Sequence, residues 1–173
     1  MNRRRRRRLK VSGFVYRAHN PRWAFAPDSG AGAASAGGRF NPVGVPALYT
    51  SVRFETAWLE AQQAFPFKAQ PMTLCAYEVE CEDVLDLTDA ATLTAHGIVF
   101  ADLACPWKEL STRGLRPPSW AAAEQLVAAG IAGVLVPSFA KGAGSAAVNA
   151  VFWDWASAGP HQVRVVADER RLP

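Results

Sequence analysis

Apolar residues recur along this chain of 173 residues with two periods, one typical of strands and one typical of helices. Runs rich in β-branched and aromatic residues predict strands at 13–18, 47–49, 72–80, 84–87, 131–137, 151–155 and 162–167. Helical spacing predicts short helices at 88–95 and 120–129, with Thr88 and Ser119 as their N-caps. It also predicts an amphipathic helix that begins after Thr50 or Ser51 and ends at Pro66, with an apolar stripe made of Phe54, Ala57, Trp58, Ala61 and Phe65.

The order of these elements is mixed, and strands and helices do not alternate regularly. That order predicts a single α+β domain with mixed or antiparallel sheets and flanking helices. No Gly-x-Gly-x-x-Gly follows the first strand, which disfavours a Rossmann domain. A length of 173 residues suits one domain with a substantial core.

Charge is concentrated at the N-terminus. The formal charge is +4, but Arg3–Arg8 supply six of the 19 basic side chains, which leaves 13 against 15 acidic ones, or −2, for the rest. We therefore expect residues 1–12 to be a disordered basic tail. The other reading is an arm that binds nucleic acid, although the remaining chain offers no basic track to continue it.

Three cysteines, at positions 75, 81 and 105, show no Cys-x-x-Cys spacing, and the spacing of the histidines suggests no zinc site. Reduced thiols and no metal are therefore expected. No apolar run is long enough for a signal peptide or a membrane span, so the sequence predicts a soluble cytoplasmic protein that does not act at a membrane.

Several candidate site residues lie in or shortly after a long segment, 20–46, that is rich in Gly, Ala, Pro and Ser. A loop of that length is commonly a binding loop or lid, and its glycines let backbone approach a ligand closely. Arg39 beside exposed backbone N–H groups suits a phosphate or pyrophosphate, and Tyr49 can present a flat face to a ring. Glu60 can stabilise a positive centre, but periodicity does not decide between Glu55 and Glu60 as the carboxylate that faces a site.

Two further segments carry polar residues after predicted strands. Arg17 lies near the end of the first strand, and Ser138 follows the strand at 131–137. A second glycine loop, 141–145, lacks the spacing of a P-loop, and no Gly-x-Ser-x-Gly surrounds Ser138. Neither segment identifies a reaction by itself.

Taken in order, these motifs resemble the RES-domain toxins of bacterial toxin–antitoxin modules of the RES–Xre or ParT–ParS type. The matching segments, which cover roughly residues 13–155, are Tyr16-Arg17, Gly37-Gly38-Arg39-Phe40-Asn41 with Gly44, Leu48-Tyr49-Thr50-Ser51, Glu60, Gly133-Val134-Leu135-Val136-Pro137-Ser138 and Asn149. The resemblance implies a RES domain over 13–173 with a fold related to ADP-ribosyltransferases. His19 and the alanine-rich 31–36 do not match the family pattern.

The resemblance also implies the function: a type II toxin that consumes NAD⁺ by cleaving the nicotinamide–ribose bond. Glu60 would face the oxocarbenium-like centre, and Arg17 and Arg39 would bind the pyrophosphate or the adjacent ribose. Tyr49 would stack on nicotinamide or flank the ribose, Ser138 would position Glu60 or contact the carboxamide, and Asn149 is expected to brace a loop beside the ligand. The implied partner is an antitoxin with a helix-turn-helix (Xre-like) domain whose tail covers the site.

Alternatives remain open at this point. Water or phosphate as acceptor gives NAD⁺ glycohydrolase or phosphorylase activity, whereas a protein acceptor makes the chain a mono-ADP-ribosyltransferase; the segments around Cys105-Pro106-Trp107 and Pro118-Ser119-Trp120 resemble the branch with protein-modifying members. A toxin homodimer within the complex is also compatible with the sequence. Outside this class, the chain could be a nucleic-acid-binding module acting through Arg3–Arg8 or a non-catalytic interaction protein.

Overall fold

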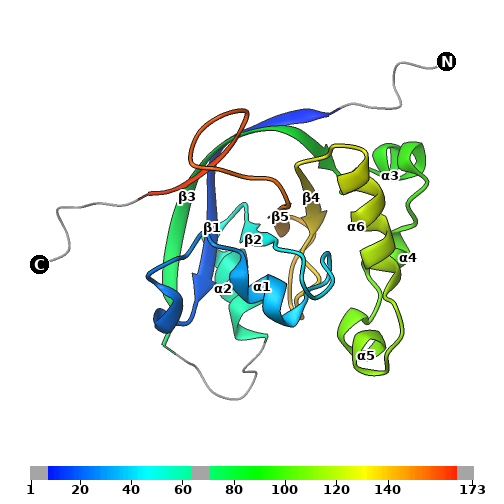
Figure 1. Cartoon of the computed structure of the whole chain (residues 1–173), viewed down its shortest axis with the longest axis horizontal. Coiled ribbons are helices and arrows are strands. Elements are labelled where there is room, and N and C mark those ends of the chain that lie inside the picture. Colours follow the sequence, from blue (N-terminus) through cyan, green and yellow to red (C-terminus); the bar gives the residue numbers. More distant parts are fainter. Residues whose placement is uncertain (1–7, 64–70, 167–173) are drawn as a thin grey trace, which may run out of the picture.

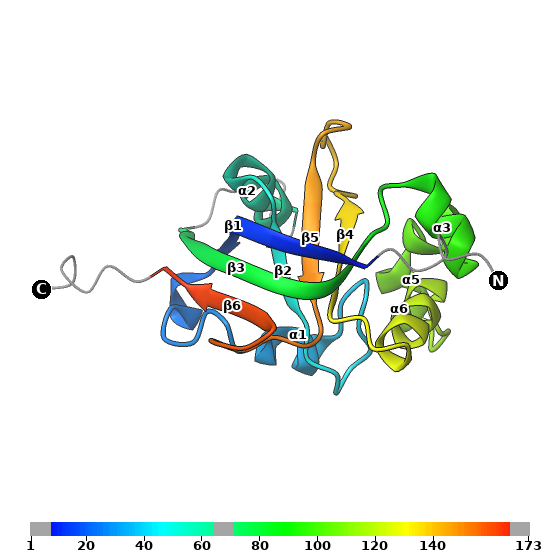
Figure 2. The same ribbon diagram turned by 90° about the horizontal axis from the view of Figure 1, so that it is seen from above.

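Two three-stranded layers cross in the computed structural model, which describes residues 8–63 and 71–166 (Figure 1). One layer holds β1, β3 and β6 in antiparallel pairing, and the other holds β2, β5 and β4, also antiparallel. Figure 2 shows β1 and β3 passing across β2, β5 and β4. The strand bounds are β1 Leu9–His19, β2 Leu48–Ser51, β3 Thr73–Asp86, β4 Gly133–Pro137, β5 Val148–Phe152 and β6 His161–Val165.

The layers join at two places, so their strands form a closed circuit. The end of β3 pairs in parallel with β4 through Val84–Asp86, and β1 pairs with β2 at Tyr16 and Ser51. Apolar side chains that alternate along both layers fill the space between them, as expected for strands with one buried face. The largest of these buried side chains are Tyr77, Val79, Val84, Leu48 and Phe152.

Helices α3, α4 and α6 lie on the other side of β4 and form a second core with it (Figure 1). Successive residues of a strand point to opposite faces, so Val134 and Val136, which are two positions apart on β4, point to the same face. There they pack in one cluster with Leu103 and Leu126 of these helices. The helix bounds are η2 Pro21–Trp23 (a 3₁₀ turn), α1 Ala31–Ala36, α2 Phe54–Gln62, α3 Ala90–His96, α4 Phe100–Leu103, α5 Trp107–Thr112 and α6 Pro118–Ala128. The predicted single α+β domain with mixed sheets is confirmed.

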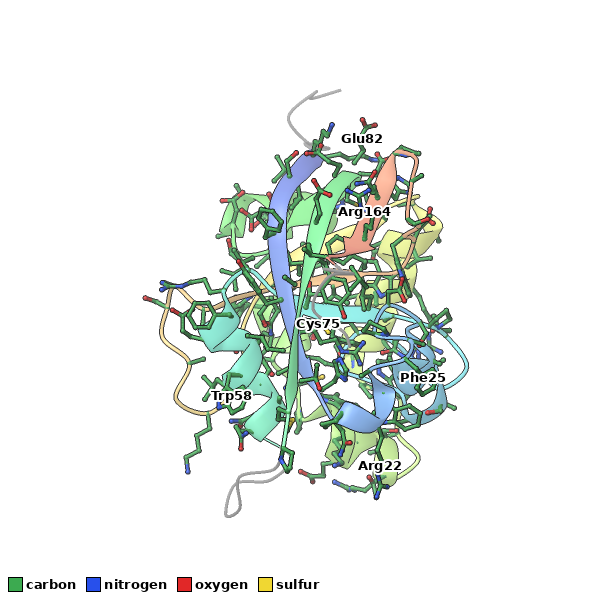
Figure 3. All side chains as sticks on the ribbon, turned by 90° about the vertical axis from the view of Figure 1, so that its left-hand side faces the viewer. Arg22, Phe25, Trp58, Cys75, Glu82 and Arg164 are labelled. Atoms are coloured by element: carbon green, nitrogen blue, oxygen red, sulfur yellow. The ribbon has the colours of Figure 1, made fainter. Side chains whose placement is uncertain are left out.

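The orientation of α2 differs from the amphipathic prediction. Phe54 and Trp58 of the expected apolar stripe are exposed (51% and 45%), whereas Thr56 and Ala57 are buried. Figure 3 shows Trp58 on α2, which lies beside β1. The small Ala57 lets the helix pack closely beside the sheet, and Glu60 then takes the inner side. Phe65 and Pro66 lie outside the described residues.

Several predicted boundaries were wrong because a side chain had another partner. Thr50 and Ser51 belong to β2 and do not cap α2, and Asp89, rather than Thr88, caps α3 through the N–H groups of Ala91 and Thr92. Ser119 lies inside α6. The long loop expected at 20–46 contains η2 and α1, and residues 98–118, where the sequence predicted neither a helix nor a strand, contain α4 and α5.

β1 is longer than predicted and begins at Leu9, so residues 9–12 of the expected tail pair with β3. Arg8 immediately before it donates from Nη2 to Ala129 O (2.7 Å) and from Nη1 to Gly130 O (3.2 Å), where α6 ends. The same Nη1 lies 2.5 Å from Asp83 Oδ1. The last arginine of the run therefore contacts the folded domain, and residues 1–7 lie outside the described residues.

Candidate active site

A cavity of about 520 Å³ opens where β1, α2, the glycine-rich segment 37–40 and β5 meet. Segments far apart in sequence contribute to it because the two layers cross at this point. Five of the six residues expected from the sequence line it, namely Arg17, Arg39, Tyr49, Glu60 and Asn149. The sixth, Ser138, lies behind the wall and reaches the site through Glu60.

Glu60 is held by one oxygen of its carboxylate. Its Oε1 accepts hydrogen bonds from Ser138 Oγ (2.6 Å) and Asn149 Nδ2 (2.5 Å). Among residues 8–63 and 71–166, no group donates to Oε2. Two donors on one oxygen fix the carboxylate plane and leave the second oxygen available to a ligand in the cavity.

Asn149 is itself oriented by Ser51, which lies directly opposite it in the β2–β5 register. Ser51 Oγ donates to Asn149 Oδ1 (2.7 Å), so the amide must turn its Nδ2 towards Glu60. Ser51 is 2% exposed. The side chain that the sequence suggested as a helix cap is therefore the start of a hydrogen-bonded series from Ser51 to Asn149 to Glu60.

The choice between Glu55 and Glu60 is settled by their positions on α2. Glu55 is exposed and pairs with Arg53 (3.2 Å) on the outer surface. A hydrogen bond from backbone and, after it, the one from Arg53 hold the pKa of Glu55 below its usual value. Glu60, five residues on, is half-buried and faces the cavity.

Tyr49 supports the glycine-rich segment with its hydroxyl. The Tyr49 hydroxyl accepts from Phe40 N–H (2.9 Å) and donates to Asn41 Oδ1 (2.7 Å). Asn41, fully buried, donates in turn to Ala33 O (2.9 Å) and Val45 O (2.8 Å). Burial raises the pKa of Tyr49, so the phenol stays neutral. Its ring lines the cavity, but its hydroxyl is already engaged.

Indole and hydroxyl groups from other elements also donate hydrogen bonds to backbone carbonyls of the glycine-rich segment. Trp120 Nε1 donates to Gly38 O (2.7 Å), and Trp153 Nε1 donates to Phe40 O (2.9 Å). Ser119 Oγ donates to Arg39 O (2.5 Å). A Cβ on Gly38 would lie 2.5 Å from the Tyr49 hydroxyl, so this position has no room for a side chain.

Arg39 combines a structural contact with a place in the cavity. Its Nη1 donates to Leu103 O (3.0 Å) and Cys105 O (2.7 Å), and its guanidinium lies 4.5 Å from the Phe139 ring centroid. Burial lowers the pKa of Arg39, an effect opposed by Cys105 and Glu60, yet an arginine remains charged at neutral pH. Its other donors have no partner among the described residues.

Arg17 lies across the cavity on β1, and its hydrogen bond to the backbone is long. Its Nη1 donates to Pro27 O (3.3 Å), the same carbonyl that accepts from the Tyr77 hydroxyl (2.7 Å). Arg17 also interacts with two neighbours on β3: burial raises the pKa of Tyr77 and of Cys75, and Arg17 opposes both shifts. Two guanidinium groups make this cavity suited to an anion.

Three residues that the sequence did not predict to be in the site, Trp107, Phe139 and Gln63, also line the cavity. Gln63, just after α2, accepts from Lys141 N–H through Oε1 (3.0 Å), which ties the second glycine loop to the helix. The signal for Trp107 was weak because the segment around it read as irregular. His19, by contrast, is not in the cavity wall; it is buried, with Nε2 3.3 Å from Cys75 Sγ.

Within residues 8–63 and 71–166, no group of three His, Cys, Asp or Glu side chains is arranged to hold a metal ion. In the same residues no helix has the length and apolar character needed to traverse a bilayer. The three cysteines are free thiols, and burial raises the pKa of Cys81 to about 12. The charged side chains that line the cavity are the Glu60 carboxylate and the guanidinium groups of Arg17 and Arg39.

Comparisons with known proteins point in one direction. The family model described as RES domain matches residues 14–173. Among solved structures, a similar fold occurs in the crystal structure of the M. tuberculosis MbcT–MbcA toxin–antitoxin complex. The TM-score is 0.66 at 22% sequence identity, and the match covers 92% of this chain and 84% of that chain. At this identity the likeness concerns the fold. A search of the curated proteins found no match.

Proposed function

The chain belongs to the RES-domain family, and from that membership and the cavity geometry we propose that it is a toxin that cleaves the nicotinamide–ribose bond of NAD⁺. One observation carries the proposal: a carboxylate anchored through Oε1, with Oε2 left free, lies in a cavity with two arginines. A fixed negative charge near bound phosphates is unfavourable unless it stabilises a positive centre. Cleavage of NAD⁺ creates such a centre.

The reaction requires heterolysis of the bond between ribose C1′ and the nicotinamide nitrogen. The bonding electrons pass to the ring, which leaves as neutral nicotinamide, and C1′ becomes oxocarbenium-like. Glu60 Oε2 then faces developing positive charge that the ground state lacks at C1′, so the interaction lowers the barrier. An acceptor oxygen attacks C1′ and loses its proton.

Arg17 and Arg39 would bind the pyrophosphate through the donors that they do not use within the chain. Planar guanidinium groups suit bidentate contact with phosphate oxygens. Tyr49 would flank the nicotinamide ribose with its ring edge, since its hydroxyl is engaged by the glycine-rich segment. Ser138 and Asn149 would act on the substrate through Glu60.

The acceptor is water or phosphate in this proposal, which makes the chain an NAD⁺ glycohydrolase or phosphorylase. Transfer of ADP-ribose to a protein acceptor is the alternative. Labelled NAD⁺ supplied to a lysate separates the two, because transfer to protein would leave label in the precipitated fraction.

The proposed partner is a cognate antitoxin. The structure with the similar fold is a toxin–antitoxin complex, and the RES toxins that the motifs resemble pair with helix-turn-helix (Xre-like) antitoxins. An antitoxin segment that covers the cavity would exclude NAD⁺. Adding the purified antitoxin encoded beside the toxin gene should suppress nicotinamide release, whereas an unrelated helix-turn-helix protein should not.

The direct test is nicotinamide release from NAD⁺ by the purified chain, with and without phosphate. We expect Glu60→Gln to reduce release by about 1,000-fold, because it removes the charge and keeps the shape. Glu55→Gln is the matched control on the same helix and should retain wild-type activity. Stimulation by phosphate would identify phosphorolysis. Wild-type protein that is folded and releases no nicotinamide, with no transfer to protein in a lysate, would overturn the proposal.

A further inference from the structure

The six tryptophans of the chain fall into three groups in the structure. Trp120, Trp153 and Trp155 each donate the indole N–H to a backbone carbonyl, at Gly38, Phe40 and Asp28. Trp23 and Trp58 are exposed (61% and 45%) and do not line the cavity. Trp107 alone among the described tryptophans lines the cavity, and no described residue accepts from its indole N–H.

Trp107 is not part of the hydrophobic core. It is half-buried, and it belongs to neither of the two hydrophobic clusters that fill the interior. A large aromatic ring left partly exposed in a cavity wall, with a free N–H donor, loses the benefit of burial unless something packs on it. Its surroundings are therefore those of a ligand-contacting side chain.

The backbone beneath Trp107 is fixed in place by Arg39. Trp107 is the first residue of α5, and the carbonyls of Leu103 and Cys105 just before it both accept from Arg39 Nη1. Trp107 N–H closes a turn onto Cys105 O (2.8 Å). The indole is thus presented by a turn that a cavity arginine holds directly, which suits precise contact with a planar group.

The order of groups along the cavity wall indicates which planar group this is. Arg39 is hydrogen-bonded to Leu103 O and Cys105 O in the turn that carries Trp107, whereas Glu60 is held by Ser138 and Asn149 on the β4–β5 side of the cavity. The turn that carries Trp107 is therefore attached to the arginine, and the carboxylate is attached to a different part of the wall. In NAD⁺ the pyrophosphate lies between the nicotinamide ribose and the adenosine. With Glu60 at the ribose and Arg39 at the pyrophosphate, the adenosine half extends towards Trp107.

We propose that Trp107 stacks on the adenine ring of the dinucleotide and is the side chain that selects an adenine-containing substrate. The inference rests on the proposed function, since it takes the direction of the substrate from the role of Glu60. Stacking of an indole on a purine needs a flat exposed face and tolerates an open rim, which matches a half-buried ring at a cavity wall. The free N–H is available to a base or ribose acceptor.

Intrinsic fluorescence of the full chain carrying Glu60→Gln tests the stack without turnover. Adenosine monophosphate and nicotinamide mononucleotide are the two probes, and circular dichroism verifies the fold of each variant. Adenosine monophosphate should quench the emission. Adding Trp107→Leu should abolish that quench and weaken binding, followed by calorimetry, about tenfold, whereas Trp107→Phe should lose the quench and keep most of the affinity. Trp58→Leu is the matched control and should change neither.

The outcomes distinguish this inference from the function beneath it. Unchanged affinity for adenosine monophosphate in Trp107→Leu, alongside nicotinamide release by the wild type, would overturn the stack and leave the NAD⁺ reaction standing. Loss of affinity for nicotinamide mononucleotide alone would show that the substrate lies the other way round and would also overturn it. Absence of both release and NAD⁺ binding in the wild type would overturn the two together.

Discussion

The cavity has two walls that are built from different kinds of hydrogen bond. In the carboxylate wall (Ser51, Glu60 and Asn149, with Ser138 behind it), side chains bind one another. In the glycine-loop wall (Gly37–Asn41 with Tyr49), side chains from β2, α6 and the segment after β5 bind the main chain of the loop. One wall orients a reactive group, and the other gives the cavity its shape.

This difference predicts where the effect of a substitution will be seen. A bond between two side chains on rigid strands can be removed while the backbone stays in place, so the rate should fall and stability should change little. A bond from a side chain to loop backbone holds the loop itself, so its loss should lower stability as well as activity. The following substitutions test that contrast, starting with the largest expected effect.

Asn149→Ala should lower kcat/KM for NAD⁺ by about 100-fold, because Glu60 loses one of the two donors that fix its carboxylate plane. The free energy of unfolding should fall by no more than about 1 kcal/mol. Nicotinamide-release kinetics and urea unfolding measure the two effects. Asn20→Ala, which removes an amide that caps η2 outside the cavity, is the control for rate. A stability loss with an unchanged rate would contradict the assignment of this wall.

Gly38→Ala should lower the free energy of unfolding by about 2 kcal/mol, because the new methyl would collide with the Tyr49 hydroxyl and Asn41 Oδ1. Gly38 does not have a positive φ, so contact rather than backbone strain causes the loss. Activity should fall as the loop shifts. Gly32→Ala is the matched control: it lies in α1 with nothing near its Cβ, and it should stabilise the protein slightly. Equal unfolding midpoints for the two variants would contradict the expected collision of a methyl group at Gly38 with its neighbours.

Tyr49→Phe should cost about 1–2 kcal/mol of stability, since Phe40 N–H and Asn41 Oδ1 lose a partner while the ring remains. The raised pKa of Tyr49 gives the effect a pH dependence. Folding keeps this phenol protonated, so its contribution is present below about pH 10 and is lost as the pH rises further. Urea midpoints at pH 7 and pH 11 should show the difference shrinking. Tyr16→Phe, whose hydroxyl has no partner among the described residues, should leave stability unchanged.

Asp83→Asn provides a reference outside both walls. It should lower the free energy of unfolding by only about 0.5 kcal/mol, because the ion pair between Asp83 and Arg8 is partly exposed. Asp83 has a positive φ (57°), which asparagine tolerates well. Arg8 holds the pKa of Asp83 below its usual value, so the contribution is present above about pH 4 and disappears as the pH falls through the lowered pKa. Unfolding at pH 7 and pH 3 tests this, with unchanged nicotinamide release expected at pH 7. A difference that grows in acid would contradict the sign.

The sequence located the site better than it located the elements around it. The motifs named Arg17, Arg39, Tyr49, Glu60 and Asn149, and all five line one cavity. They could be found because each lies within or beside a conspicuous local pattern, such as the glycines or the end of a strand. Their roles in binding and catalysis stay predictions.

What the sequence could not supply were contacts that depend on the third dimension. Ser51 satisfied every local rule for a helix cap, yet its hydroxyl binds Asn149 on a strand that arrives 98 residues later. The apolar stripe of α2 satisfied helical periodicity, yet Ala57 packs inwards and Trp58 does not. Trp107 lay in a segment that short-range patterns read as irregular, because α4 and α5 span only four and six residues.

The closed circuit of strands has a consequence for how the protein is made. β5 fills the place between β2 and β4, and it begins only at Val148 of 173 residues. Both β2 and β4 therefore have an unpaired edge until the ribosome has synthesised β5, and Glu60 lacks its Asn149 donor for the same period. A nascent chain stalled or truncated before β5 would carry Arg17, Arg39 and Glu60 without the wall that orients them. The order of synthesis thus delays any activity of this site until translation of the domain is nearly complete.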